Sequence, residues 1–213
     1  MEHNFDACLA EVLRHEAGFT SNPKDPGNWT GGKVNVGILR GTNMGISAAS
    51  YPHENIRGMT RERAGQIYRR DYWNAVRGDD LPSGLDLVAF DSAVNSGVSR
   101  GAKWLQAGVG AKQDGKIGPA TIAAARAYDT RTAVNRACDA RLAFLKTLGT
   151  WPTFGKGWSR RVASVRSTAL AMATPTRPAP KPAVYPPANS PAAPRPATGF
   201  WAWLNRIFGG TNA

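Results

Sequence analysis

Apolar side chains recur at helical spacing near the start of the chain. They occupy positions i, i+3, i+4, i+7 and i+8, and they are Phe5, Cys8, Leu9, Val12 and Leu13. This spacing predicts an amphipathic helix over residues 4–16. Glu16 takes the next position of the same stripe, and Ala17-Gly18 follows it. Because a carboxylate on the core side of a helix is costly, we expect Glu16 to have a chemical use.

Helical periodicity returns in six further segments. They are residues 60–77, 84–95, 99–107, 119–127, 131–148 and 157–172. Residues 17–59 are rich in Gly, Asn, Pro and Thr instead, and a long irregular stretch of this kind is usually functional. Within it we expect one short hairpin, around residues 34–38. The pattern therefore predicts a mainly α fold, with a helical body and a small loop or β-hairpin lobe.

The composition changes sharply near residue 174. Nine prolines fall among the 22 residues from Pro175 to Pro196, which is typical of an extended linker without a core. The tail that follows, residues 199–213, carries an amphipathic aromatic segment with Phe200, Leu204 and Phe208 on one helical face. We predict a short helix there, which either lies on anionic or outer-membrane lipid or docks back on the folded domain.

The charge balance indicates an anionic partner. The chain has 27 Lys and Arg against 15 Asp and Glu, a net charge of +12. Nucleic acid, an anionic membrane and a cell wall bearing phosphate and carboxylate all satisfy this charge. Because the sequence contains no recognised nucleic-acid-binding module, we expect no specific nucleic-acid partner.

Cysteine usage and the first residues bear on where the protein works. Cys8 and Cys138 both lie on apolar stripes, which predicts two buried thiols rather than a disulfide framework. The first fifteen residues are polar and mixed in charge, without the apolar core of a secretion signal. We therefore expect a protein that is made in a cytoplasm and acts in the periplasm or cell wall after release. Separately, we expect it to be a monomer.

Three polar residues near the end of the first helix suit the hydrolysis of a glycosidic bond. That reaction needs a proton donor and a second group that activates water or stabilises the developing cation. Burial would raise the pKa of the Glu16 carboxyl and keep it protonated as the donor. Asp25 lies in a polar loop that favours its charged form, and Thr30 offers a hydroxyl to hold a water. Taken singly, Glu16 reads as a solvated helix end and Asp25 as a turn residue.

The order of these residues across a helix-to-loop junction resembles the Glu–Asp–Thr triad of phage-type lysozymes. Four longer segments resemble glycoside hydrolase family 108, the N-acetylmuramidases found among phage endolysins. These segments are Glu16-Ala17-Gly18-Phe19, Asp25-Pro26-Gly27-Asn28-Trp29-Thr30, Gly45-Ile46-Ser47 and Phe90-Asp91-Ser92-Ala93-Val94-Asn95-Ser96-Gly97. Ala17 and Phe19 depart mildly from the family pattern, and residues 31–43 lengthen the loop before Gly45.

The second half resembles the peptidoglycan-binding-type region that usually accompanies this catalytic part. Its marks are Trp104-Leu105-Gln106, Asp114-Gly115-Lys116-Ile117-Gly118-Pro119, Arg141-Leu142 and Phe154-Gly155-Lys156-Gly157-Trp158-Ser159-Arg160-Arg161. We therefore divide the chain into a lysozyme-like catalytic region, a helical region packed with it, a Pro/Ala-rich linker and the aromatic tail. Their bounds are residues 1–97, 98–173, 174–198 and 199–213.

The resemblance implies a lysozyme-like enzyme that cleaves the β-1,4 bond between N-acetylmuramic acid and N-acetylglucosamine. Its substrate would be peptidoglycan, with Glu16 as general acid and with Asp25 and Thr30 as its helpers. Trp29, Asp91 and Asn95 are the candidate sugar contacts. His15-Glu16 lacks the second histidine of a zinc protease motif, so we expect neither a metal nor a cofactor.

Three alternatives remain open. A lytic transglycosylase would use the same glutamate but needs no water-activating carboxylate. A cell-wall-binding protein without catalytic activity would need none of these residues for chemistry. A nucleic-acid-binding protein rests on the positive charge alone.

Overall fold

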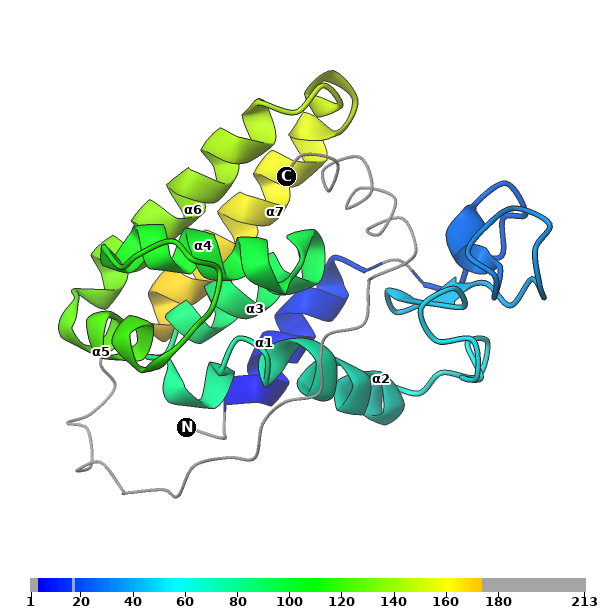
Figure 1. Ribbon diagram of the computed structural model, residues 1–213, viewed down its shortest axis with the longest axis horizontal. Helices are drawn as coiled ribbons and strands as arrows, with labels where there is room; N and C mark the ends of the chain where they lie inside the picture. Colours follow the sequence, from blue (N-terminus) through cyan, green and yellow to red (C-terminus); the bar gives the residue numbers. More distant parts are fainter. Residues whose placement is uncertain (1–3, 17, 174–213) are drawn as a thin grey trace.

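Helix α3 (Leu85–Ser96) forms the centre of the molecule, because all of its residues are buried. The computed structural model describes residues 4–16 and 18–173. Around α3 pack the helices α1 (Asn4–Arg14), α4 (Val98–Val109), α6 (Thr130–Lys146) and α7 (Trp151–Met172) (Figure 1). A single core of apolar side chains extends from Phe5 in α1 to Ala169 in α7.

Capping residues set the ends of several helices. Helix α2 (Arg61–Tyr68) begins after Thr60, whose hydroxyl accepts a bond from the Arg63 N–H, and it continues into a π-helical turn, η2 (Arg69–Trp73). Helix α5 (Pro119–Ala127) starts with a proline, which needs no N–H partner at that position. Asp129 caps α6, because its carboxylate accepts the Thr132 N–H at 2.8 Å. A short 3-10 turn, η3 (Gly78–Asp80), precedes α3.

The predicted helices are confirmed, with two differences at their ends. The segment predicted over residues 60–77 divides into α2 and the π-helical turn. Helix α7 begins six residues earlier than residue 157, at Trp151, because Pro152 suits the first turn of a helix. Cys8 and Cys138 are both free and buried, as their stripes predicted.

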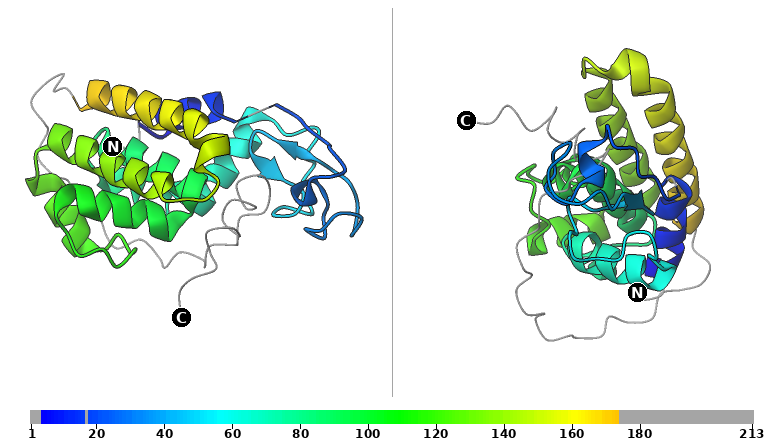
Figure 2. Two further views of the ribbon diagram at one scale, coloured as in Figure 1. Left: turned by 90° about the horizontal axis from the view of Figure 1, so that it is seen from above. Right: turned by 90° about the vertical axis from the view of Figure 1, so that its right-hand side faces the viewer.

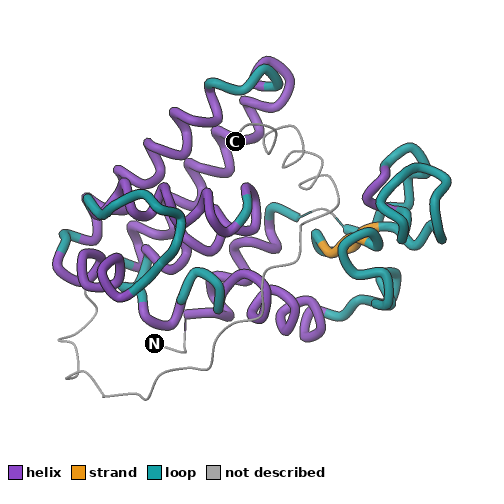
Figure 3. The backbone as a smooth tube through the Cα atoms, viewed as in Figure 1, coloured by secondary structure: helices purple, strands orange, loops and turns teal. Residues whose placement is uncertain are grey.

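A small lobe of turns and one β-hairpin projects from one end of the helical body (Figures 1, 2 and 3). It contains the 3-10 turn η1 (Pro26–Asn28) and the antiparallel strands β1 (Thr42–Asn43) and β2 (Ile46–Ser47). No strand forms at residues 34–38, where a short hairpin was predicted, but the chain does reverse there: Trp29 and Leu39 form an antiparallel bridge, and the Thr30 N–H donates to the Ile38 carbonyl at 3.0 Å. Asn35 and Gly37 have φ of 62° and 81° and turn the chain there. The tight hairpin turn forms instead at Met44-Gly45, where both φ values are positive.

The predicted mainly α fold with a small hairpin lobe is confirmed. Helix α4 packs between α3 and α6, so the predicted second region is continuous with the core of the first. The linker and the aromatic tail, residues 174–213, lie outside the described residues.

Candidate active site

Glu16 lies just beyond the last turn of α1, where the helix meets the lobe. Its backbone N–H still donates to the Leu13 carbonyl at 3.2 Å, so the residue keeps a helical hydrogen bond. Its side chain is only 3% exposed, as the apolar stripe predicted. The stripe did not predict a charged neighbour, yet Oε1 of Glu16 accepts a hydrogen bond from Nη1 of Arg161 at 3.0 Å. The Glu16 carboxyl is therefore both buried and paired with a guanidinium group.

Arg161 belongs to a buried chain of four charged side chains that joins four parts of the fold. Its Nη2 lies 2.7 Å from Oδ1 of Asp91 in α3, and Oδ2 of Asp91 lies 2.5 Å from Nη1 of Arg141 in α6. None of the four side chains is more than 4% exposed. Two carboxyl groups alternate with two guanidinium groups, and this pairing offsets the cost of burying charge. We call Glu16, Arg161, Asp91 and Arg141 the buried ion network.

The ionisation of Asp91 follows from its two arginine neighbours. Burial by itself would raise the pKa of this carboxyl, but Arg161 and Arg141 outweigh that effect and lower its pKa to about 2. The guanidinium of Arg161 loses solvation by burial, and the charges of Asp91 and Glu16 overcome this and raise its pKa above the usual value. Arg161 therefore remains a cation beside Glu16 at every pH relevant to a folded protein.

The turn of the β-hairpin closes over Glu16. A side chain on Gly45 would place its Cβ 2.9 Å from Oε2 of Glu16 and 2.4 Å from the hydroxyl of Tyr68. Tyr68 donates a hydrogen bond of 2.9 Å to the Met44 carbonyl and so fixes the turn. Burial and the nearby charge of Glu16 raise the pKa of Tyr68, which keeps its hydroxyl a donor. The contact explains why a glycine follows Met44.

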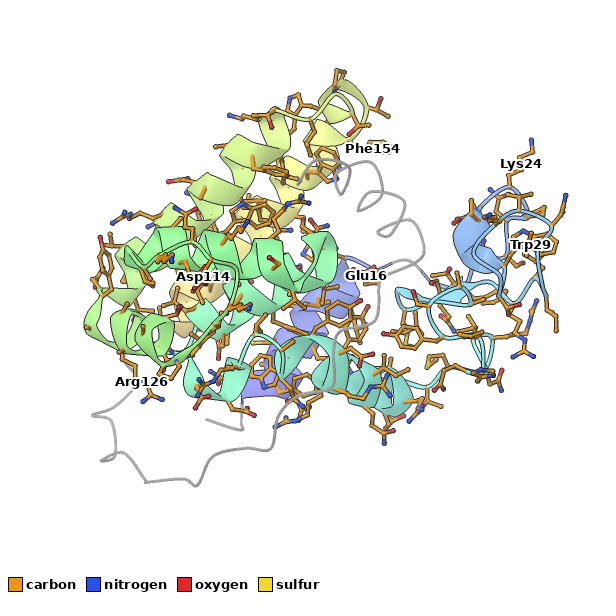
Figure 4. All side chains as sticks on the ribbon, viewed as in Figure 1. Glu16, Lys24, Trp29, Asp114, Arg126 and Phe154 are labelled. Carbon is orange, nitrogen blue, oxygen red and sulfur yellow. The ribbon has the colours of Figure 1, made fainter. Side chains whose placement is uncertain are left out.

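The other two predicted catalytic residues lie in the lobe and make local hydrogen bonds. Oδ1 of Asp25 accepts the Gly27 N–H at 2.8 Å and caps η1. The hydroxyl of Thr30 accepts the Ile38 N–H at 2.9 Å. Figure 4 places Glu16 at the edge of the helical body and Lys24 and Trp29 on the projecting lobe. The lobe therefore presents the segment around Asp25 and Thr30, and the body presents Glu16.

The predicted sugar contacts occupy different surroundings. The indole N–H of Trp29 donates to the Pro23 carbonyl at 2.9 Å, which fixes the ring within the lobe. Asp91 has no exposed surface and contacts arginines of the buried ion network. Asn95, at the end of α3, is 4% exposed, and its Nδ2 has no hydrogen-bond partner among the described residues. A buried donor without a partner is costly, so Asn95 is suited to receive one.

Arg161 and Arg141 were named only within segments that mark the peptidoglycan-binding-type region, and the sequence analysis did not place them beside Glu16 and Asp91. Both occupy apolar stripes, Arg141 with Cys138 and Leu145, and Arg161 with Trp158 and Val165. The criterion applied to Glu16, a charged residue at an apolar position of a helix, also identifies both arginines.

Comparison with known proteins decides the family. The family model for Glycosyl hydrolase 108 matches residues 9–97. The solved structure of Brucella abortus SagA is 42% identical, with a TM-score of 0.69, and the match covers 83% of this chain and 99% of that one. The chain belongs to glycoside hydrolase family 108. No curated protein matches it.

Membership of family 108 makes the protein a glycosidase and points to peptidoglycan as its substrate. The part matched by the family model contains Glu16, Asp25 and Asp91, whereas Arg141 and Arg161 lie beyond it. The helices after residue 97 therefore complete the surroundings of Glu16 in this family 108 chain.

Within residues 4–16 and 18–173, no three His, Cys, Asp or Glu side chains are grouped so as to hold a metal ion. Within the same ranges, no helix is both long and apolar enough to span a bilayer.

Proposed function

We propose that the protein is an N-acetylmuramidase that lyses bacterial walls, as an endolysin does. It would hydrolyse the β-1,4 bond between N-acetylmuramic acid and N-acetylglucosamine. One observation carries the proposal: a buried carboxyl, Glu16, is fixed between Arg161 and the Gly45 turn, where the helical body meets the lobe. A fixed carboxyl of this kind is what general acid catalysis requires.

Arg161 makes proton transfer from Glu16 more favourable, because its permanent charge stabilises the carboxylate that the transfer leaves behind. The proposal requires that Glu16 carries its proton when the substrate is bound. As Glu16 passes its proton to the glycosidic oxygen, negative charge develops on its carboxylate. The guanidinium 3.0 Å away stabilises that charge without having to reorganise, because Asp91 and Arg141 already hold it in place. We assign Asp91 to this positioning role, since it has no exposed surface for a sugar.

The lobe would supply the second half of the chemistry. Asp25 activates water or stabilises the cation, and Thr30 helps to hold that water. Trp29 offers a ring for a sugar face, whereas Nδ2 of Asn95 is buried and, like Asp91, has no exposed surface for a sugar. A water between the two carboxyls gives inversion of the anomeric centre, which goes with a carboxyl separation of roughly 6.5–9.5 Å.

A lytic transglycosylase is the second candidate, and one observation favours it. Oδ1 of Asp25 and the hydroxyl oxygen of Thr30 already accept backbone N–H bonds within the lobe, and a transglycosylase needs no water-activating carboxylate. Transglycosylation closes a 1,6-anhydro ring on the muramic acid, whereas hydrolysis adds water.

Mass spectrometry of the fragments released from purified peptidoglycan separates these reactions. We expect fragments that end in a reducing N-acetylmuramic acid and carry the mass of one added water. Fragments with a 1,6-anhydro end would establish the transglycosylase. Fragments that end in reducing N-acetylglucosamine would move the cleavage to the other glycosidic bond.

A further inference from the structure

A basic pocket lies in the lobe. Its volume is about 520 Å³, and its lining includes Phe19, Leu39, Arg40 and residues 53–57. Thr20 and Thr42 exchange backbone hydrogen bonds of 2.8 and 2.9 Å, which join the first two segments. Nδ2 of Asn43 donates to the Ile56 carbonyl at 3.2 Å and so holds residues 53–57 beside them. We call this hollow the basic pocket.

The charge of the pocket is positive after its internal pairs are counted. Its one acidic residue, Glu54, accepts a 3.0 Å hydrogen bond from Nε of Arg63 and so is already neutralised. Arg40 and Arg57, by contrast, make no ion pair with any described residue. Two guanidinium groups therefore face the hollow without a carboxylate partner.

Local contacts hold both arginines in place. The guanidinium carbon of Arg57 lies 4.4 Å from the centre of the Phe19 ring, a cation–π contact that orients its flat face. Nη1 of Arg40 donates to the Pro52 carbonyl at 2.8 Å. Arginines fixed in this way lose little side-chain entropy when they bind a carboxylate, and their forked N–H groups match its two oxygens.

The pocket is tied to the catalytic glutamate through the hairpin. Phe19 follows Glu16 by three residues, and its ring packs against Gly41, where an added Cβ would lie 2.8 Å from the ring. Gly41 leads directly into β1, and the turn after β1 places Gly45 against Glu16. The pocket and Glu16 therefore contact the same hairpin, the pocket residue Phe19 just before β1 and Glu16 at the turn after it.

We propose that the basic pocket binds a carboxylate carried by the muramic acid substituent of peptidoglycan. That substituent ends either in the carboxylates of a peptide stem or, without the peptide, in the carboxylate of the lactyl group. The neutral sugar backbone offers Arg40 and Arg57 nothing comparable. This inference rests on the proposed function, because it concerns which part of the same substrate the lobe recognises.

The test compares native glycan strands with the same strands after carbodiimide amidation of their carboxylates. We expect wild-type protein to cleave native strands with a kcat/KM about tenfold higher, the effect of one charge-assisted hydrogen bond. The double variant Arg40→Gln/Arg57→Gln should lose most of this preference and cleave both substrates at the amidated rate. Strands stripped of peptide identify the source, because they retain only the lactyl carboxylate.

The control variant removes two charges elsewhere. Lys112→Gln/Lys146→Gln changes two exposed lysines that lie outside the pocket lining and outside the segments that mark the peptidoglycan-binding-type region. This variant should keep the full preference. If wild type and Arg40→Gln/Arg57→Gln prefer native over amidated strands equally, the pocket does not bind the carboxylate. If both double variants lose the preference equally, the cause is general charge attraction, which also overturns the proposal. If wild type cleaves neither substrate, the proposed function itself fails. Melting temperatures of all three proteins exclude unfolding as the cause.

Discussion

At the scale of single residues, Glu16 owes its properties to neighbours that come from three distant parts of the chain. Arg161 lies 145 residues away in sequence, while Gly45 and Tyr68 come from the hairpin and from α2. A periodic pattern in one helix predicts that a side chain points inward. It does not predict which side chains from other helices meet it there, because those contacts depend on how the helices pack.

Asp25 both caps the turn η1 and carries a negative charge, and a substitution can remove the charge while keeping the cap. Asparagine keeps the oxygen that accepts the Gly27 N–H but removes the negative charge. We expect Asp25→Asn to fold like wild type and to lose about a hundredfold in kcat if the charge takes part in catalysis. Asp25→Ser is the companion variant, which also keeps a capping oxygen. Turnover by Asp25→Asn within a factor of about two of wild type would assign Asp25 to the cap alone.

Gly45 is the second residue-scale test. Alanine there would press a Cβ against Oε2 of Glu16 and against Tyr68, so we expect kcat to fall by about a hundredfold as the carboxyl is displaced. Gly110→Ala is a matched control, since Gly110 has a similar φ of 70° and nothing within 4 Å of its added Cβ. The two variants should lose similar stability to backbone strain, yet Gly110→Ala should keep its activity. Full activity of Gly45→Ala would mean that the turn does not fix Glu16.

At the scale of helices, apolar periodicity predicted most of the fold. The stripes of α3, α5 and α6 placed those helices to within about two residues, the usual scatter of helix ends. The lobe was harder to predict from the sequence. Its hairpin depends on residues with left-handed backbone angles, such as Met44 and Gly45, rather than on an alternation of apolar and polar side chains. Val34, Val36 and Ile38 alternate like a strand, yet these three side chains are exposed.

The buried ion network predicts how α3, α6 and α7 depend on one another. Asp91→Asn leaves Arg141 and Arg161 buried with one anion fewer, which should lower the free energy of unfolding by about 3–5 kcal/mol. Asp139→Asn is the control, because Asp139 pairs with Arg166 across the same two helices α6 and α7, but Asp139 is 65% exposed. That variant should cost under about 1 kcal/mol. Urea unfolding of the two variants checks this, and equal losses would contradict it.

The same network gives a pH dependence whose sign follows from Asp91. Its pKa in the folded protein, about 2, lies below the usual value of 3.8. The charged form therefore stabilises the fold above about pH 4, and this contribution is lost as the pH falls towards 2. Wild type and Asp91→Asn should differ in stability by their full margin at pH 5, and this margin should narrow steadily below pH 4. A margin that stays constant down to pH 2 would show that Asp91 does not hold this charge.

At the scale of the whole molecule, the net charge of +12 should concentrate the enzyme on anionic walls. We expect the rate on intact walls to fall as NaCl rises from 20 to 300 mM, since attraction is screened within about 10 Å at 0.1 M. The rate on short soluble fragments should change much less, because they are reached without long-range attraction to a surface. Equal salt dependence on both substrates would show that the net charge does not concentrate the enzyme on the wall.

The sequence identifies the family of the whole molecule but not every residue that surrounds Glu16. Segments around Glu16, Gly45 and Asp91 pointed to family 108, and the comparisons confirmed it. These segments did not show where the arginines of the buried ion network come from. Both arginines lie in helices α6 and α7, beyond the residues matched by the family model. A charge on an apolar stripe is visible in the sequence, but its partner becomes visible only when the helices are assembled.

The most direct test of the account is the rate at which Glu16→Gln releases reducing ends from purified peptidoglycan. Glutamine has nearly the same shape and its oxygen can still accept the Arg161 hydrogen bond, but it cannot donate the proton that the leaving oxygen requires. We predict a fall in kcat of at least about a hundredfold, with the circular dichroism spectrum of the wild type retained. A folded Glu16→Gln protein that clears peptidoglycan at the wild-type rate would contradict the central claim that Glu16 is the general acid.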